Sequence, residues 1–297
     1  APQLPRRGPR ESMLGQVSAG MAGVAPAPDG TLVLEGAAFA ATPPDEPLDP
    51  DAWAATIAFL RAAGAAGRTG PVKLQLTGPV TLAVALALAG GRAQQALAAA
   101  EVTVVGRVRA LVAAARALAP GVPLVVVLDE PGLPAWNAGG PPRAVERTID
   151  VLSSSMAAAG PSVLVGVHCC APADWRVVME AGPDLVSLPV DRSLGDDDAG
   201  FAAFLDRGGL IAWGVVPTDR PMGQTDELQW RRLMELWAEL SSNGCDPGRL
   251  RAQSVLTPAC GLALHDPAQV EPVYARVRRI ADRLRDQLGE NQVCAGA

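Results

Sequence analysis

The sequence predicts an α/β protein built as a TIM-type (β/α)8 barrel. From about residue 51 onward, short apolar runs rich in Val and Leu alternate with longer helix-like stretches. Continuous apolar strands separated by helices are typical of a parallel sheet covered on both faces. Reactive side chains follow the ends of several of these strands, and in a β/α barrel those ends form one rim where active sites are built.

Six apolar runs are the expected strands of the sheet. They cover residues 72–76, 124–128, 163–167, 185–188, 210–216 and 255–256 with its neighbours. Residues 31–34 are a seventh candidate. Because eight strands close a barrel, we expect a missing first strand to precede residue 1.

Helices are expected between the strands, in one barrel domain that spans residues 1–297 with its core at 51–290. The segments with helical character are 51–66, 80–118, 143–159, 172–181, 197–207, 225–242 and 267–288. Residues 1–50 are expected to be irregular, with a short helix near 12–21 and a Pro-rich loop at 39–50. Asp51 is expected to cap the helix that follows this loop.

A doubly wound open sheet is the competing architecture. That fold commonly places a Gly-x-Gly-x-x-Gly turn or a phosphate loop directly after a strand. No such motif follows any of the six runs, and the barrel is therefore favoured.

Composition narrows the classes of partner. The formal net charge is −6, and no basic stripe is present, which argues against a nucleic-acid surface. The most apolar stretch, residues 80–89, is shorter than the roughly 20 residues that a membrane span requires. No signal peptide is visible, and five scattered cysteines do not resemble a disulfide framework, so we expect a reducing cytoplasm. Lys73 is the only lysine, and arginine carries nearly all of the positive charge.

A zinc site is predicted at the ends of two of the strands. His168 and Cys170 follow an apolar run and, two residues apart on an extended chain, point to the same side, whereas Cys169 points away. Cys260 follows a later strand. Taken singly, His168 or Cys170 is better explained as a buried residue of the core. Together they supply the nitrogen and sulfur ligands that zinc prefers and leave a fourth position for a substrate.

The remaining cysteines and the second histidine are not expected to bind the metal. Cys245 and Cys294 lie in sequence typical of loops, and Cys169 is expected in the core or behind the metal ligands. His265 lies in a polar segment before the last helix and is expected at the surface or beside the start of that helix.

Two adjacent carboxylates, Asp129 and Glu130, end another predicted strand. Neighbouring side chains on a strand point to opposite sides, so at most one of them faces the barrel mouth. They bind a substrate or belong to a solvated loop. The segment 77–81 ends a further strand, with Gly78 for a tight turn and Pro79 at a helix start. It is a plain connection or a floor of backbone N–H groups under a substrate.

Four of these segments together resemble the catalytic domain of cobalamin-independent methionine synthase, within the uroporphyrinogen decarboxylase-like superfamily. In chain order they are Leu-Thr-Gly-Pro-Val-Thr at 76–81, Leu-Asp-Glu-Pro-Gly-Leu at 128–133, the His168-x-Cys170 pair, and Pro-Ala-Cys-Gly-Leu at 258–262. The resemblance covers about residues 71–290. It implies a β/α barrel with zinc held by His168, Cys170 and Cys260, and with substrate-binding carboxylates at Asp129 and Glu130, of which Asp129 would hold the amino group.

The chain departs from the family pattern at several positions. Pro189 stands where the family has a fourth ligand, a Glu, and Asp191 two positions later is the candidate replacement. Asp219 stands near the place of a family His, so it becomes the candidate catalytic proton donor. The N-terminal Gly-Ser-Phe-Pro-like strand is absent, and the Gly-Glu-Pro-Glu-Arg motif is at best echoed at residues 7–13.

The resulting hypothesis is a zinc-dependent methyltransferase that methylates homocysteine with a methylfolate donor. One alternative keeps the thiol chemistry but takes the methyl group from a corrinoid protein. Another is a barrel that retains metal without turnover. The expected partners are a small thiol and its methyl donor, with no nucleic acid and no membrane.

Overall fold

The computed structural model describes residues 2–36, 38–43, 45–139, 144–190, 194, 198–219, 225–263 and 265–294. The chain divides into two compact units. Unit 1 comprises Ala1–Cys169 and Glu180–Pro183, and unit 2 comprises Cys170–Met179 and Asp184–Ala297.

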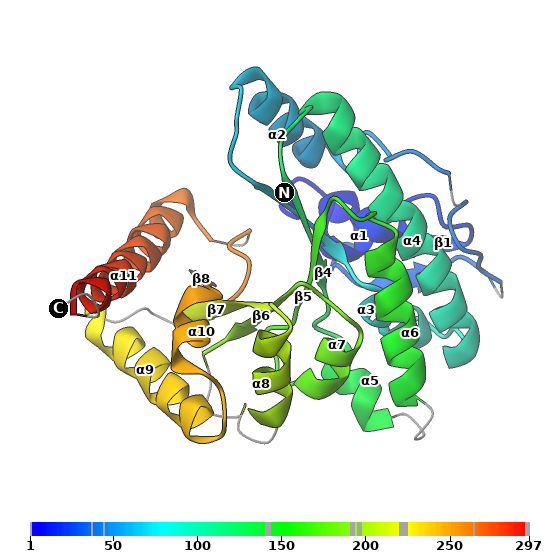
Figure 1. Cartoon of the computed structure of the whole chain (residues 1–297). Coiled ribbons are helices and arrows are strands. Elements are labelled where there is room, and N and C mark those ends of the chain that lie inside the picture. Colours follow the sequence, from blue (N-terminus) through cyan, green and yellow to red (C-terminus); the bar gives the residue numbers. More distant parts are fainter. Residues whose placement is uncertain are drawn as a thin grey trace. The chain divides into compact units, whose positions relative to one another are not determined.

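The main sheet has six strands whose order follows the sequence, β3-β4-β5-β6-β7-β8 (Figure 1). Their bounds are Val72–Thr77, Leu124–Asp129, Leu164–His168, Leu185–Pro189, Leu210–Val216 and Ser254–Pro258. The four strand pairs known residue by residue, β3–β4, β4–β5, β6–β7 and β7–β8, are all parallel. All six predicted runs are confirmed as strands. A sequential parallel order belongs to the barrel type, and the doubly wound alternative is excluded because its strand order reverses.

The seventh candidate strand was placed in the wrong sheet. Leu32–Leu34 forms β2, but it pairs antiparallel with β1, Val24–Pro26, in a separate two-stranded sheet. Periodicity identified the extended conformation correctly, whereas pairing depends on contacts distant in sequence that a three-residue strand cannot reveal.

The long helical stretch predicted at 80–118 is two helices. Helix α3, Pro79–Leu88, ends where Gly90 adopts a φ of +105°, a conformation that L side chains rarely adopt, and α4 begins at Ala93. The other helices of unit 1 are η1 (Pro9–Glu11), α1 (Met13–Ser18), α2 (Ala54–Ala65), α4 (Ala93–Leu118), α5 (Leu133–Gly139) and α6 (Ala144–Ala157). In Figure 1, α3, α4 and α6 lie beside one another along β4 and β5.

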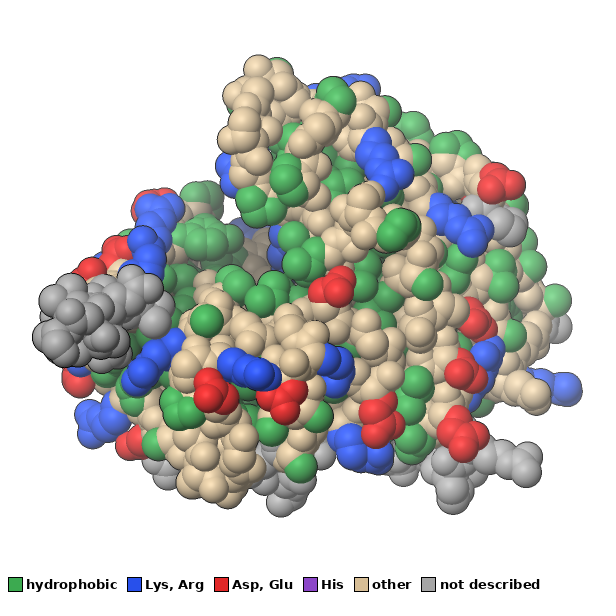
Figure 2. Space-filling model, viewed as in Figure 1, with side chains coloured by type: hydrophobic (Ala, Val, Ile, Leu, Met, Phe, Trp, Pro, Cys, Tyr) green, Lys and Arg blue, Asp and Glu red, His purple; other side chains and the backbone are tan. Residues whose placement is uncertain are grey.

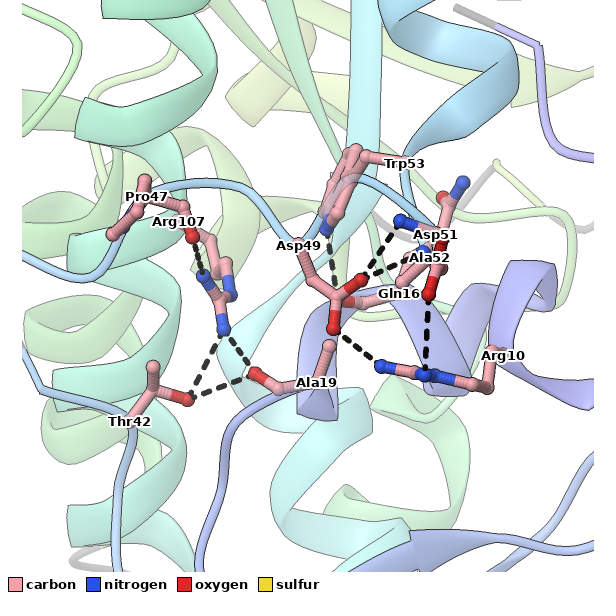
Figure 3. A network of polar contacts seen from close by, with 10 residues as sticks. All are labelled: Arg10, Gln16, Ala19, Thr42, Pro47, Asp49, Asp51, Ala52, Trp53 and Arg107. Atoms are coloured by element: carbon pink, nitrogen blue, oxygen red, sulfur yellow. Dashed lines mark hydrogen bonds and ion pairs between the residues drawn. The ribbon is translucent and has the colours of Figure 1, made fainter.

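A cluster of polar contacts fixes the N-terminal segment on unit 1 (Figure 3). The buried guanidinium of Arg107, on α4, donates to the backbone oxygens of Ala19 and Pro47. Asp49 accepts from the backbone N–H groups of Asp51 and Ala52 and pairs with Arg10. The cap predicted at Asp51 is therefore wrong: α2 begins at Ala54 after Trp53 and has no side-chain cap, and Asp49 instead binds N–H groups of the turn that precedes the helix.

Four of the helices described in unit 2 correspond to predicted stretches, whereas α10 (Pro247–Ala252) was not predicted. The helices are α7 (Trp175–Glu180), α8 (Asp198–Asp206), α9 (Glu227–Ser242), α10 and α11 (Pro267–Cys294). Cys294 is thus the last residue of a helix rather than part of a loop. In the core of this unit Trp213, on β7, packs against Trp237, on α9, with ring centroids 6.4 Å apart, and donates its Nε1–H to Ser254 Oγ on β8 at 2.8 Å.

On the described part of the face in Figure 2, acidic and basic side chains are interspersed. Among the described helices, none has the combined length and apolar character that a bilayer crossing demands.

Candidate metal and substrate site

Three strand ends of unit 1 are level with one another. In the parallel registers Thr77 of β3 lies opposite Asp129 of β4, and Asp129 lies opposite His168 of β5. The carboxyl ends of neighbouring parallel strands share one edge, so the carboxylate and the imidazole that the sequence places after separate strands emerge side by side.

The predicted metal ligands converge. His168 ends β5 and is half-buried, Cys170 follows two residues later, and Cys260 comes two residues after β8; both thiols are exposed. One ligand atom from each residue, an imidazole nitrogen and two sulfurs, lies within 4.8 Å of the other two. Tetrahedral zinc with Zn–S of about 2.3 Å and Zn–N of about 2.0 Å separates its ligand atoms by about 3.5–3.8 Å. The donor set and its spacing therefore fit zinc after a small closure.

The other thiols and the second imidazole lie apart from this group. Cys169 is fully buried, as alternation predicts, and Cys245 is also buried in a loop beyond α9. His265 is half-buried just ahead of α11. In the described part of the chain, no further group of three metal-ligating side chains is found.

Asp129 is a buried carboxylate on the same edge as His168. It is 6% exposed, and burial raises its pKa above the ordinary value, whereas the charges of Lys73 and His168 lower it. The opposing effects are therefore charges acting through space. A carboxylate compensated in this way gains from a cationic group placed beside it.

Glu130 is buried too, but its oxygens are bound by the chain itself. Oε1 accepts from the N–H of Val80 at 2.9 Å, and Oε2 accepts from the N–H and the hydroxyl of Thr81 at 2.6 and 2.5 Å. These are the free N–H groups at the start of α3. Burial raises the pKa of Glu130 to about 7, against the lowering effect of these hydrogen bonds.

The turn between β3 and α3 is shaped to receive Glu130. A Cβ on Gly78 would lie 2.2 Å from Glu130 Oε1, so only glycine leaves room for the carboxylate. The Thr81 hydroxyl that donates to Glu130 also accepts from the N–H of Gly132 at 3.0 Å. The backbone N–H groups considered as a floor under a substrate therefore serve Glu130, which supports the reading of this segment as a connection.

The group of three ligands found among the described residues does not include the two remaining predicted site residues. Asp191, the candidate fourth ligand, falls outside the described residues. Asp219 follows β7, Leu210–Val216, and is exposed in the loop beyond it. The sequence analysis gave no role to Thr81 or Lys73. A signal for both was present, because strand alternation puts Lys73 on the same side as Thr77, and the predicted helix start needed an acceptor for its N–H groups.

The fold is shared with methyltransferase structures. A B12-independent methionine synthase from Shewanella sp. W3-18-1, solved with selenomethionine, superposes with a TM-score of 0.54 at 16% identity, over 91% of this chain and 78% of that one. A Listeria monocytogenes protein designated a vitamin B12-independent methionine synthase gives 0.61 at 14% identity, over 91% and 77%. A methyltransferase from Methanosarcina mazei gives 0.53 at 16% identity, over 86% and 74%.

At these sequence identities the structural similarity establishes the fold alone. The chemistry has to be inferred from the residues of the site. No protein-family model matches the sequence, and no curated protein matches it.

Proposed function

We propose that this chain is a zinc-dependent methyltransferase whose acceptor is a thiol, homocysteine in the first instance, with a methylfolate as donor. The observation that carries the proposal is the convergence of His168, Cys170 and Cys260 within 4.8 Å. The fold shared with two methionine synthases and a methyltransferase supports it.

His168 would hold zinc through a ring nitrogen, and Cys170 and Cys260 through thiolate sulfurs, with Asp191 as the candidate fourth ligand. Zinc supplies one thing when bound: it favours the deprotonated form of a coordinated thiol and so provides a nucleophile at neutral pH. With the fourth position open, the thiolates of Cys170 and Cys260 would balance the charge of the zinc ion, and a substrate thiolate held there would keep an excess of negative charge on its sulfur; a carboxylate ligand from Asp191 would add one further negative charge.

Asp129 would bind the ammonium group of the acceptor. Its position opposite His168 places a buried negative charge next to the metal ligands. Glu130 would not contact the substrate, because both of its oxygens are bound to the start of α3. Its effect on the substrate would come only from holding the turn between β3 and α3 in place.

In the transfer itself, the bond between the methyl carbon and the donor nitrogen breaks as the carbon–sulfur bond forms, and the nitrogen takes up a proton. We assign delivery of that proton to Asp219. A corrinoid protein as donor is the second candidate, because an exposed Asp stands near the position where the resemblance places a His.

Metal analysis tests the proposal first. Purified wild-type protein is expected to hold one zinc, and a Cys170→Ser, Cys260→Ser double variant is expected to lose it. The matched control is Cys169→Ala, which changes the buried cysteine between the ligands and should retain zinc. Wild-type protein without zinc, or a double variant that keeps it, would refute the site.

The donor is tested separately. Wild-type protein is incubated with homocysteine and either methylfolate or methylcobalamin, and methionine is measured. Methionine formed from methylfolate supports the first candidate. Product from methylcobalamin alone supports the second, and no product from either excludes both donors.

A further inference from the structure

The only lysine of the chain lies on the same face of the sheet as Asp129 and His168. Lys73 and Thr77 are four residues apart on β3, and alternation puts them on one side. Because Thr77 is level with Asp129, and Asp129 with His168, all of these side chains belong to one face.

The ammonium group of Lys73 is directed toward the strand end that carries Asp129. Its Nζ donates to Gln75 Oε1 at 3.0 Å, and Gln75 is the next residue of that face in the direction of Thr77. The charge of Lys73 also acts on Asp129, where it is the larger of the two side-chain influences that lower the pKa.

We propose that Lys73 is the residue that binds the carboxylate of the acceptor amino acid and so discriminates it from a thiol without a carboxylate. This inference rests on the proposed function. An α-amino acid carries its ammonium and carboxylate groups on one carbon, and its binding calls for an anion and a cation close together on one surface. Asp129 and Lys73 supply the anion and the cation on one face of the sheet, and the charge of Lys73 acts on Asp129.

No other cation of β3, β4 or β5, all three fully described, shares this face. The remaining positions that alternation assigns to it are Gln75, Thr77, Val125, Val127, Leu164 and Gly166, and His168 is a metal ligand in the proposed function. In these three strands only Lys73 offers a positive charge to a carboxylate held near Asp129.

The test measures binding without requiring turnover. In cobalt-substituted protein Cys170 and Cys260 already give thiolate charge-transfer absorption, and a coordinated substrate thiolate adds a further band whose titration yields a Kd. Two thiols are compared: homocysteine, and 3-aminopropane-1-thiol, which keeps the amino group and lacks the carboxylate. The variants are Lys73→Met, Lys73→Arg and, as the matched control, Arg68→Met, which removes an exposed cation just before β3.

Lys73→Met is expected to weaken homocysteine binding by about ten- to a hundredfold, the effect of one charge-assisted hydrogen bond, and to leave 3-aminopropane-1-thiol unchanged. Lys73→Arg should bind homocysteine more tightly than Lys73→Met does. Arg68→Met should bind both thiols as tightly as the wild-type protein. If Lys73→Met does not fold, Lys73→Gln takes its place.

If Lys73→Met weakens the binding of both thiols equally, or the binding of neither, this inference is overturned, whereas the proposed thiol site is unaffected. A wild-type protein that binds cobalt but gives no further band with either thiol would overturn the proposed function, and this inference with it.

Discussion

Unit 1 contains two polar clusters whose charged groups are stabilised in opposite ways: in the N-terminal cluster only Arg107 is buried, whereas both carboxylates of the strand-end cluster are buried. The N-terminal cluster, made by Arg10, Asp49 and Arg107, neutralises charge with charge and with backbone groups of the same segment. The strand-end cluster, made by Asp129 and Glu130, places two carboxylates side by side. Glu130 is held by neutral donors, and Asp129 by charges at a distance.

The difference separates a structural role from a binding role. A cluster that neutralises itself gains nothing from a ligand, and its removal is felt as lost stability. A buried carboxylate that depends on distant charges is costly to the folded chain, but it adds binding energy when a cation arrives. Within the strand-end cluster the two roles divide again, since Glu130 fixes the turn and Asp129 faces the metal ligands.

The largest effect on stability is expected from Glu130→Ala. The change leaves the N–H groups of Val80 and Thr81 and one hydroxyl without their acceptor, at a cost of about 3–4 kcal/mol in the free energy of unfolding. Urea denaturation measures it. Glu35→Ala, at an exposed glutamate of the same unit, is the control and should stay within about 0.5 kcal/mol. A loss no larger than that of the control would mean that Glu130 does not support the turn.

A somewhat smaller effect is expected from Arg107→Ala. The variant removes the guanidinium that joins α4 to Ala19 and Pro47, and we expect a loss of about 2–3 kcal/mol with easier proteolysis in residues 19–50. Arg109→Ala changes an exposed arginine two positions away on the same helix and provides the comparison. Identical digestion patterns for the two variants would contradict an anchoring role.

The two clusters should also respond to pH in opposite directions. Burial raises the pKa of Glu130 from 4.5 to about 7, so its contribution is greatest below pH 4.5 and falls by about 2–3 kcal/mol as pH rises to 7. For Asp49 burial raises the pKa, but the N–H groups of Ala52 and Asp51 and the charges of Arg10 and Arg107 outweigh it, and the pKa is lowered. Its contribution is present above pH 3.8 and disappears as pH falls further.

Unfolding free energies of wild type, Glu130→Gln and Asp49→Asn between pH 3 and 8 measure both contributions. The difference in unfolding free energy between wild type and Glu130→Gln should decrease as pH rises toward 7. The difference between wild type and Asp49→Asn should decrease as pH falls toward 3. Parallel curves for all three proteins would remove the distinction between the clusters.

The sequence predicted the parts of this molecule that depend on local pattern. The six sheet strands followed from apolar runs, and the convergence of His168, Cys170 and Cys260 followed from residue type, spacing and strand-end position, because a parallel fold brings such ends together. The division at Gly90 and the misplacement of residues 32–34 show where local pattern fails. Helix breaks depend on one backbone angle, and strand partners depend on distant contacts.

The roles of Asp129 and Glu130 could be separated only with coordinates. Alternation showed that they face opposite ways, but not which of them serves the chain. That answer comes from a glycine, Gly78, whose missing side chain admits the carboxylate of Glu130. An open space of this kind leaves no trace in the periodicity of the sequence.

The smallest effect on stability, and the sharpest on binding, is expected from Asp129→Asn. Burial raises the pKa of this carboxyl, so a neutral amide of the same shape removes a cost, and the free energy of unfolding should change by less than about 1 kcal/mol. In cobalt-substituted protein the variant should bind homocysteine about tenfold or more weakly, because the ammonium loses its charged partner. 4-Mercaptobutyrate carries the carboxylate without the amino group. It should bind the Asp129→Asn variant at least as tightly as it binds the wild-type protein. Asp129 and Lys73 would then recognise the two charged groups on the α-carbon of one substrate, whereas equal losses for both thiols would make Asp129 a support for His168 rather than a contact for the amino group.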